Sequence, residues 1–189
     1  MAGTHLPAQS ERRDFLVQAA QALVGVGGAM ALWPFIDQMN PNQGTPPPEV
    51  REVDLRSIEP GQTKTVEWRG MPVSIRHRTW NEVRSARSVA ISDLPDPSAR
   101  NEALARSATA SDANRTKAGY EQWLVVVSLC THLGCRLATG AASPFSEGWF
   151  CPCHAARFDV SGRVRSGPAR TNLVVPPYTF LSPTRLRIG

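Results

Sequence analysis

The sequence lacks several features that would point to common functions. The formal net charge is +5, yet no basic helix or stripe is present, because the arginines are scattered singly, as at Arg56, Arg69, Arg84, Arg100 and Arg115. Scattered arginines predict a solvated surface, with docking to an acidic redox partner as the alternative, and argue against nucleic-acid binding. No internal repeat is present, and 189 residues are too few for a large multidomain enzyme.

Cysteine is absent from most of the chain. The four cysteines lie within 24 positions of one another, and two of the four histidines lie among them: Cys130, His132, Cys135, Cys151, Cys153 and His154. Clustered cysteine and histidine in a chain otherwise free of cysteine predict a metal site or a disulfide framework.

Charged side chains are missing from residues 15–36, between Asp14 and Asp37. These 22 residues reach about 33 Å as a helix, enough for a hydrocarbon core of about 30 Å. We therefore expect one transmembrane anchor helix over residues 14–37.

Two arginines, Arg12 and Arg13, precede this span, and no lysine or arginine follows it before Arg51. The asymmetry predicts that residues 1–13 are cytoplasmic and that everything after the span lies outside the inner membrane, in the periplasm. The arginine pair also resembles a twin-arginine export signal.

A cleaved signal peptide is the alternative to a retained anchor, because Ala29-Met30-Ala31 has a small-x-small form. The Trp33-Pro34 pair that follows favours a helix end at the membrane interface.

A tether over residues 38–50 follows the anchor, and its Pro46–Pro48 run predicts a stiff, extended backbone. Beyond it, residues 51–189 predict one β-rich soluble domain. A capping box at Thr79 and Glu82 predicts a short helix, and residues 85–120 read as irregular with a helical patch. Alternation, apolar runs and turn signals predict strands at residues 63–68, 73–77, 124–129, 148–150, 159–164 and 184–188.

The chemistry is concentrated in two short boxes, Cys130-Thr131-His132-Leu133-Gly134-Cys135 and Cys151-Pro152-Cys153-His154. Three interpretations are open: a structural zinc site, two disulfides, or a two-iron cluster bound by two thiolates and two imidazoles. The zinc interpretation fits poorly because such sites usually begin with Cys-x-x-Cys. The mixed cluster accounts for all six residues, as four ligands and one disulfide.

The two boxes resemble those of Rieske iron–sulfur proteins of quinol-oxidising cytochrome bc complexes. The resemblance extends to Arg12–Leu16, to Trp33–Pro41 and to Gly167-Pro168-Ala169. It implies a mainly β fold: a Rieske-type antiparallel β-sandwich with a small cluster-binding subdomain at about residues 125–170, preceded by one N-terminal transmembrane helix. The implied cofactor is one [2Fe–2S] cluster.

The resemblance also implies a ligand set. Cys130 and Cys151 would bind the inner iron through thiolate, and His132 and His154 the outer iron through imidazole. Imidazole donates less charge than thiolate, which raises the reduction potential of such clusters.

The remaining cysteines, Cys135 and Cys153, are implied to form a disulfide. Cysteine arithmetic alone allows three pairings of four thiols, so this choice rests on the resemblance. Leu133 and Gly134 of the first box, and the loop at Gly167 and Pro168, would shield the cluster.

The function implied is electron transfer in a quinol–cytochrome c oxidoreductase. His154 would meet the quinol, one electron and a proton would be taken up, and the electron would pass to a c-type cytochrome, contributing to proton translocation. The implied partners are cytochrome b and c-type cytochrome subunits of a dimeric, membrane-bound complex. The alternative is the Rieske small subunit of another periplasmic oxidoreductase, of the arsenite-oxidase type.

Two departures from the family pattern have consequences. Family members continue the second box with Gly-Ser-x-Tyr, whereas this chain has Ala155, Ala156, Arg157 and Phe158. Without the Ser and Tyr hydroxyls near the cluster, we expect a lower midpoint potential. The Pro-rich tether leaves two options for the soluble domain, which we call the head. Either the head pivots at a point outside the proline run, or it is nearly fixed relative to the anchor.

Overall fold

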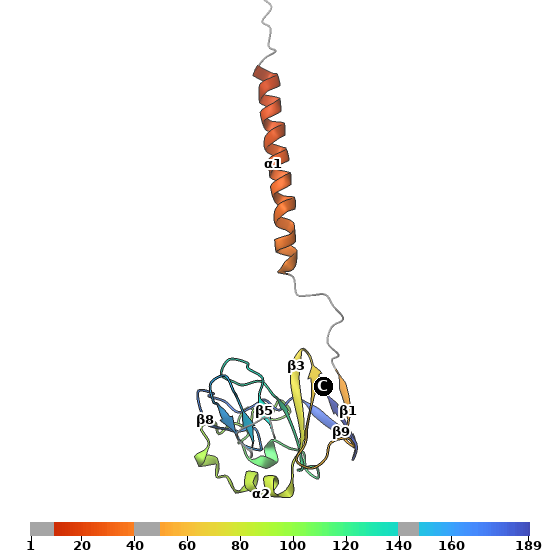
Figure 1. Ribbon diagram of the computed structural model, residues 1–189, viewed down its shortest axis with the longest axis vertical. Helices are drawn as coiled ribbons and strands as arrows, with labels where there is room; N and C mark the ends of the chain where they lie inside the picture. The colour runs from red at the N-terminus through yellow and green to blue at the C-terminus, as the bar shows by residue number, and fades with distance from the viewer. Residues whose placement is uncertain (1–9, 40–49, 140–147) are drawn as a thin grey trace, which may run out of the picture. The chain divides into compact units, whose positions relative to one another are not determined.

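The structure is a computed structural model that describes residues 10–39, 50–139 and 148–189 (Figure 1). The chain divides into two compact units, Met1–Thr45 and Pro46–Gly189, which we describe separately. The Pro46–Pro48 run and most of the expected tether lie outside the described residues.

The first unit contains one long helix, α1 (Ser10–Gln38). Its stretch Arg12–Gln38 is long and apolar enough to cross a membrane. Large apolar side chains such as Leu23, Val24 and Met30 are exposed, as expected for a helix that lipid would cover. The helix runs on past Pro34, which we expected near its end, and ends at Gln38.

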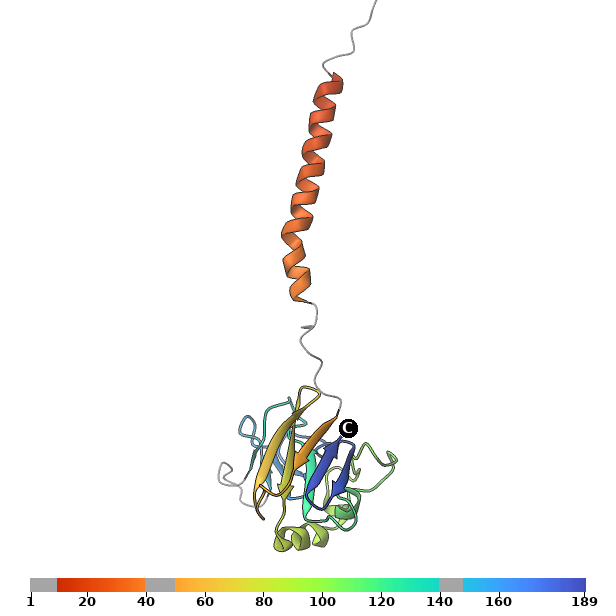
Figure 2. The same ribbon diagram turned by 90° about the vertical axis from the view of Figure 1, so that its right-hand side faces the viewer.

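The second unit is built mainly from short antiparallel strands. One three-stranded sheet has the order β1-β10-β9 and a second has the order β2-β3-β4. Figure 2 shows the C-terminal strands, in blue, beside the orange strands at the start of this unit. The six strands are β1 (Arg51–Asp54), β2 (Thr63–Trp68), β3 (Met71–His77), β4 (Trp123–Val127), β9 (Tyr178–Ser182) and β10 (Arg185–Ile188).

These two sheets enclose the main hydrophobic core. All five residues of β4 are buried, as the apolar run in the sequence predicted. Val73 and Ile75 of β3 and Leu186 and Ile188 of β10 are fully buried in the same cluster. The predicted hairpin between β2 and β3 is confirmed, with positive φ at both Arg69 and Gly70, as a two-residue turn requires.

A third sheet, with the order β5-β6-β7-β8, carries the two boxes. Its strands are β5 (Ala138–Thr139), β6 (Trp149–Phe150), β7 (Arg157–Phe158) and β8 (Val164–Ser166). With two antiparallel sheets beside this smaller one, the predicted fold class is confirmed. The strand predicted over residues 159–164 is wrong, because Asp159 caps a turn there by accepting bonds from the backbone N–H groups of Ser161 and Arg163, at 2.9 and 3.0 Å.

The segment between β3 and β4 holds the predicted helix. Helix α2 (Trp80–Ser88) begins at a complete capping box made by Thr79 and Glu82. Two short 3-10 helices follow, η1 (Ile91–Asp93) and η2 (Asp112–Asn114), within the region that the sequence predicted to be irregular.

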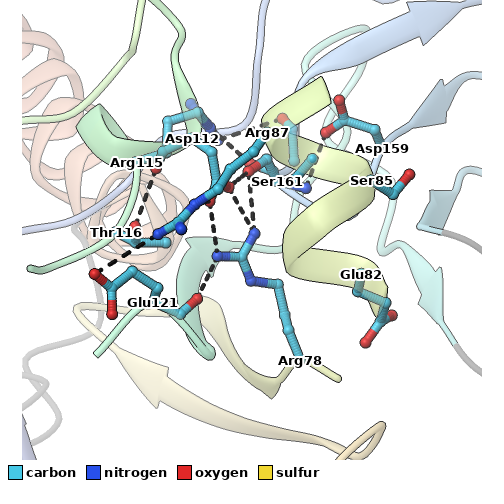
Figure 3. A network of polar contacts seen from close by, with 12 residues as sticks. Arg78, Glu82, Ser85, Arg87, Asp112, Arg115, Thr116, Glu121, Asp159 and Ser161 are labelled. Atoms are coloured by element: carbon cyan, nitrogen blue, oxygen red, sulfur yellow. Dashed lines mark hydrogen bonds and ion pairs between the residues drawn. The ribbon is translucent and has the colours of Figure 1, made fainter. Parts of the chain in front are cut away.

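A network of buried arginines fixes this segment to the turn between β7 and β8 (Figure 3). Arg78 and Asp112 form a buried ion pair at 2.6 Å, and both contact the Ser161 side chain. Arg163 is equally buried and pairs with Asp159 at 2.7 Å. Three segments far apart in the sequence are thereby joined through charged side chains.

The prediction of a solvated arginine surface is wrong for Arg115. Its side chain is fully buried and donates to the backbone carbonyls of Ala99, Ser161, Gly162 and Leu173. Burial lowers the pKa of Arg115 to about 10, so the group remains charged at neutral pH. The buried guanidinium is tolerated because its hydrogen bonds to these carbonyls replace those that it would make with water.

Candidate metal centre

The first box forms a loop that closes on itself directly after β4. The backbone N–H of Cys130 donates to the carbonyl of Cys135, and the N–H of Gly134 donates to the carbonyl of Cys130, both at 2.8 Å. Gly134 has φ +76°, a conformation that glycine adopts without strain. The loop therefore brings its two cysteines together at its base.

The second box forms a similar loop between β6 and β7. The N–H of Cys151 donates to the carbonyl of Ala156 at 2.8 Å, which closes the loop. A disulfide joins Cys135 of the first loop to Cys153 of the second, with Cα atoms 6.7 Å apart. The two boxes, 18 residues apart in sequence at these cysteines, are thus covalently linked.

The other two cysteines, Cys130 and Cys151, are free thiols and buried. The Cys151 sulfur lies within 4.8 Å of the sulfurs of Cys135 and Cys153. Burial, and to a smaller extent the neighbouring Cys151, raises the pKa of the Cys130 thiol. The interpretation of the four cysteines as two disulfides is therefore wrong.

The two histidines of the boxes face each other. The rings of His132 and His154 have centroids 4.8 Å apart and lie edge to face. His132 is half-buried, and its Nδ1 atom is buried without a hydrogen-bond partner among the described residues, whereas His154 is exposed. Buried polar atoms in proteins normally have a hydrogen-bond partner. A buried imidazole nitrogen without one is expected where that nitrogen binds a metal.

The residues present fit a two-iron cluster. Two buried thiols, two adjacent imidazoles and a disulfide that occupies the other cysteines match a centre with two sulfur and two nitrogen ligands. The structure brings together all six residues that the sequence predicted for this site.

A third loop, at Gly167 and Pro168, lies against the second box. A Cβ atom on Gly167 would stand 2.6 Å from the Cα of Ala156, so only glycine permits this approach. Ala156 and Phe158 are fully buried, and Phe158 lies opposite Trp149 of β6.

The tip of the first loop is apolar and exposed. Leu133, between His132 and Gly134, has 69% of its surface accessible. Leu133 is therefore accessible at the tip of the first loop, and Gly167 lies against the second box at Ala156.

Two features of the site were missed from the sequence. Ala155, directly after His154, has φ +56°, which side-chain-bearing residues rarely adopt. Thr131 donates from its hydroxyl to the carbonyl of Thr171 at 2.7 Å and so ties the first loop to the segment after Pro168. The second could have been suspected, because Thr131 lies inside the first box.

The fold and the paired boxes define a Rieske protein. The family model described as the Rieske [2Fe-2S] domain matches residues 96–179. A second model, described as the ubiquitinol-cytochrome C reductase Fe-S subunit TAT signal, matches residues 4–42.

Relatives narrow the class to a family. The ubiquinol-cytochrome c reductase iron-sulfur subunit of Rickettsia typhi is 47% identical over 181 residues, covering 96% of this chain and 94% of the relative. The subunit of the same name from Bradyrhizobium diazoefficiens is 49% identical over 179 residues, covering 94% of each chain. Among solved structures, a chain of a hyperthermophilic respiratory Complex III matches 90% of this chain and 98% of its own, with 22% identity and a TM-score of 0.46. The chain belongs to the family of ubiquinol-cytochrome c reductase iron–sulfur subunits.

Proposed function

We propose that this chain is the electron-transfer subunit of a quinol–cytochrome c reductase. The family membership and the names of the relatives support the role. The observation that carries it is the convergence of two free, buried thiols and two facing imidazoles on two disulfide-linked loops.

The ligands proposed are Cys130 and Cys151 for one iron and His132 and His154 for the other. A cluster bound in this way supplies one-electron transfer at a potential raised by its imidazole ligands. Burial of both thiols keeps the sulfur ligands out of water, and the disulfide holds the two loops at a fixed separation.

His154 is the residue proposed to meet the quinol. The His154 ring is exposed, whereas His132 is half-buried, so a quinol hydroxyl can reach His154 more freely than His132. With an oxidised cluster bound, the other ring nitrogen of His154 would lose its proton more easily, and in that deprotonated form it could accept a hydrogen bond from the quinol hydroxyl and take up its proton. The cluster would supply the acceptor for the electron.

The surrounding residues have supporting roles in this proposal. Leu133 contributes an apolar cover at the tip, and Gly134 permits the turn that places it there. In this proposal the loop at Gly167 and Pro168 covers the second box, which Gly167 approaches at Ala156. Together they limit the access of water to the ligands.

The location follows from the anchor. The helix over Arg12–Gln38 and the twin-arginine match suggest a membrane-anchored subunit. We propose a cytoplasmic N-terminus, a periplasmic head, and assembly with cytochrome b and c-type cytochrome subunits in a dimeric complex, which would receive the electron and contribute to proton translocation.

Electron spin resonance on membranes containing the full chain tests this function. We expect the signal of a Rieske cluster, altered by a quinol-site inhibitor, and about two iron and two acid-labile sulfide per purified chain. His132→Ala should abolish the signal. A matched control is His77→Asn, because His77 stacks on Trp123 at 4.1 Å, outside the boxes.

Two outcomes would contradict the proposal. Protein without iron would exclude the cluster. Purification with a partner that contains neither b-type nor c-type haem would favour the arsenite-oxidase type of assembly.

A further inference from the structure

Buried polar side-chain atoms without a hydrogen-bond partner are few among the described residues. They are Arg78 Nε, His132 Nδ1, Trp149 Nε1 and Tyr178 Oη. Such atoms are rare in proteins, so each one needs an explanation. His132 is a proposed iron ligand, which accounts for its nitrogen. Trp149 lies on β6, directly before the second box, and its indole N–H is still to be explained.

Trp149 shares one face of the strand pair β6–β7 with the free thiol Cys151. The register pairs Trp149 with Phe158, and the backbone N–H of Cys151 donates to the carbonyl of Ala156. Side chains alternate along a strand, so these four point to the same side. All four are buried, whereas Arg157, between Ala156 and Phe158, is exposed. The face that carries the indole therefore also carries the Cys151 sulfur.

The backbone beside Trp149 is held close to the neighbouring strand. A Cβ atom on Gly148 would collide with the backbone carbonyl of Phe158, so β6 meets β7 at the closest approach that the two backbones permit. The Trp149 side chain is 1% exposed and packs in the same hydrophobic cluster as both free thiols, Cys130 and Cys151. Its N–H therefore cannot bond to bulk water.

The indole N–H can only donate, so its partner must be an acceptor. Ala156 and Phe158, which share its face, have no acceptor in their side chains. A buried water would itself need two to four polar partners, which this apolar face does not supply. Once a cluster is bound, its thiolate and sulfide sulfurs carry negative charge, and a donor bonds more strongly to a charged acceptor than to a neutral one.

We propose that the indole N–H of Trp149 donates a hydrogen bond to a sulfur of the bound cluster, thiolate or sulfide, and thereby raises its reduction potential. The inference rests on the proposed function, which supplies the cluster. The reduced cluster carries one more negative charge than the oxidised one, so the bond stabilises the reduced state more. Trp149 thus replaces in part the hydroxyl donors that this chain lacks at positions 156 and 158.

Selective isotope labelling tests for the bond without changing the protein. The full-length, cluster-loaded chain is prepared with nitrogen-15 only in the indole rings of its five tryptophans, and the reduced cluster is examined by pulsed electron spin resonance. A bond from N–H to sulfur passes spin density to the nitrogen, so we expect a weak nitrogen-15 coupling. Trp149→Phe should remove the coupling. Trp123→Phe is the control, because Trp123 is buried at the end of β4 that pairs with His77, seven positions before Cys130.

The midpoint potential tests the consequence of the bond. At a fixed applied potential, Trp149→Phe should shift the ratio of reduced to oxidised cluster about tenfold toward the oxidised form, which is about 59 mV for a one-electron couple. Trp123→Phe should leave the ratio unchanged. A second variant has 3-benzothienylalanine at position 149, which keeps the double ring and replaces the N–H with sulfur. It should lower the potential in the same way, and it decides the assignment where Trp149→Phe does not hold the cluster.

The outcomes separate this inference from the proposed function. An unmodified chain without the signal of a Rieske cluster would defeat the proposed function itself. A Rieske signal without nitrogen-15 coupling would overturn the inference alone. So would an unchanged potential in the benzothienylalanine variant, because the Trp149 ring would then contribute only by packing.

Discussion

Ala155 has a backbone conformation that costs free energy for a residue with a side chain. Its φ of +56° lies in the left-handed region, directly between His154 and the fully buried Ala156. The cost in this region is about 1–2 kcal/mol. The second box is therefore held in a strained conformation by the structure around it.

Replacing this residue with glycine should stabilise the protein. We expect Ala155→Gly to raise the free energy of unfolding by about 1 kcal/mol, because glycine adopts positive φ without strain. Urea unfolding of the full chain measures the change. Ala105→Gly, at an exposed alanine without positive φ, should give no gain, and equal effects of the two changes would contradict the explanation.

Ala156 and Phe158 lack the hydroxyl groups that family members place near the cluster. We expect the pair Ala156→Ser and Phe158→Tyr to raise the midpoint potential, because hydrogen bonds to sulfur stabilise the more negative, reduced state. A bond to a charged group contributes about 1.5–3 kcal/mol, which corresponds to an increase of about 65–130 mV for a one-electron couple.

Voltammetry of the cluster-loaded protein measures that potential. Phe180→Tyr is the control, because Phe180 stacks on Tyr120 in the region of β9, away from the boxes. A potential that does not rise in the double variant, or that rises equally in the control, would defeat the idea.

The six residues of the metal centre could be predicted, because cysteine and histidine lie close together in each of two short segments of the sequence. The conformation of Ala155 and the burial of Arg115 could not. The residues beside Arg115 carry no signal of its burial, since the four carbonyls that accept its hydrogen bonds come from other segments of the chain.

The turn between β7 and β8 is stabilised by hydrogen bonds from Arg115. It joins the strand after the second box to the strand before the Gly167-Pro168 loop, and two of its carbonyls, of Ser161 and Gly162, accept bonds from Arg115. The network of arginines is therefore connected through this turn to the two strands that flank the second box and the Gly167-Pro168 loop.

Removing the buried guanidinium should weaken the whole domain. We expect Arg115→Met to lower the free energy of unfolding by about 3 kcal/mol or more, because four buried carbonyls lose their donor. Arg106→Met, at an exposed arginine of the same segment, should change it by no more than about 0.5 kcal/mol.

Urea unfolding again provides the comparison. Arg115→Lys keeps the charge but cannot reach four carbonyls from one nitrogen, so an intermediate loss is expected. Similar stability of the Arg115→Met and Arg106→Met variants would show that the network contributes nothing.

Among the elements, those with clear patterns were predictable. The hairpin of β2 and β3 alternates apolar and polar residues, and the start of α2 has a capping box. Strand β7 has only two residues, too few for alternation to be visible. The strand expected at residues 159–164 failed because the cap made by Asp159 outweighs the apolar Val160 and Val164.

On the scale of the whole chain, the order of anchor and β-rich domain could be read from the sequence because charge and hydropathy change abruptly. Long-range joins, such as the disulfide between the boxes, required the family resemblance or the structure. The boundaries of α1 differ from the predicted span by four residues at the start and one at the end.

Export through the twin-arginine signal can be separated from membrane topology. Arg12→Lys with Arg13→Lys keeps both positive charges, so the charge asymmetry across the span is unchanged. We nevertheless expect the head to remain cytoplasmic, because the arginine pair itself is the export signal. Protease added to spheroplasts should then leave the head intact.

The control for that experiment is Arg51→Lys with Arg69→Lys, two exposed arginines after the span. Its head should be digested as in the unmodified chain. Digestion of both variants would show that the arginine pair serves topology alone.

Gly167 meets the backbone of Ala156 so closely that position 167 cannot accept a side chain. A methyl group at 167 would separate the covering loop from the box beneath it and admit oxygen to the sulfur atoms. We therefore expect the lifetime of the protein in air to depend on Gly167, which binds no ligand and contributes only by lacking a side chain.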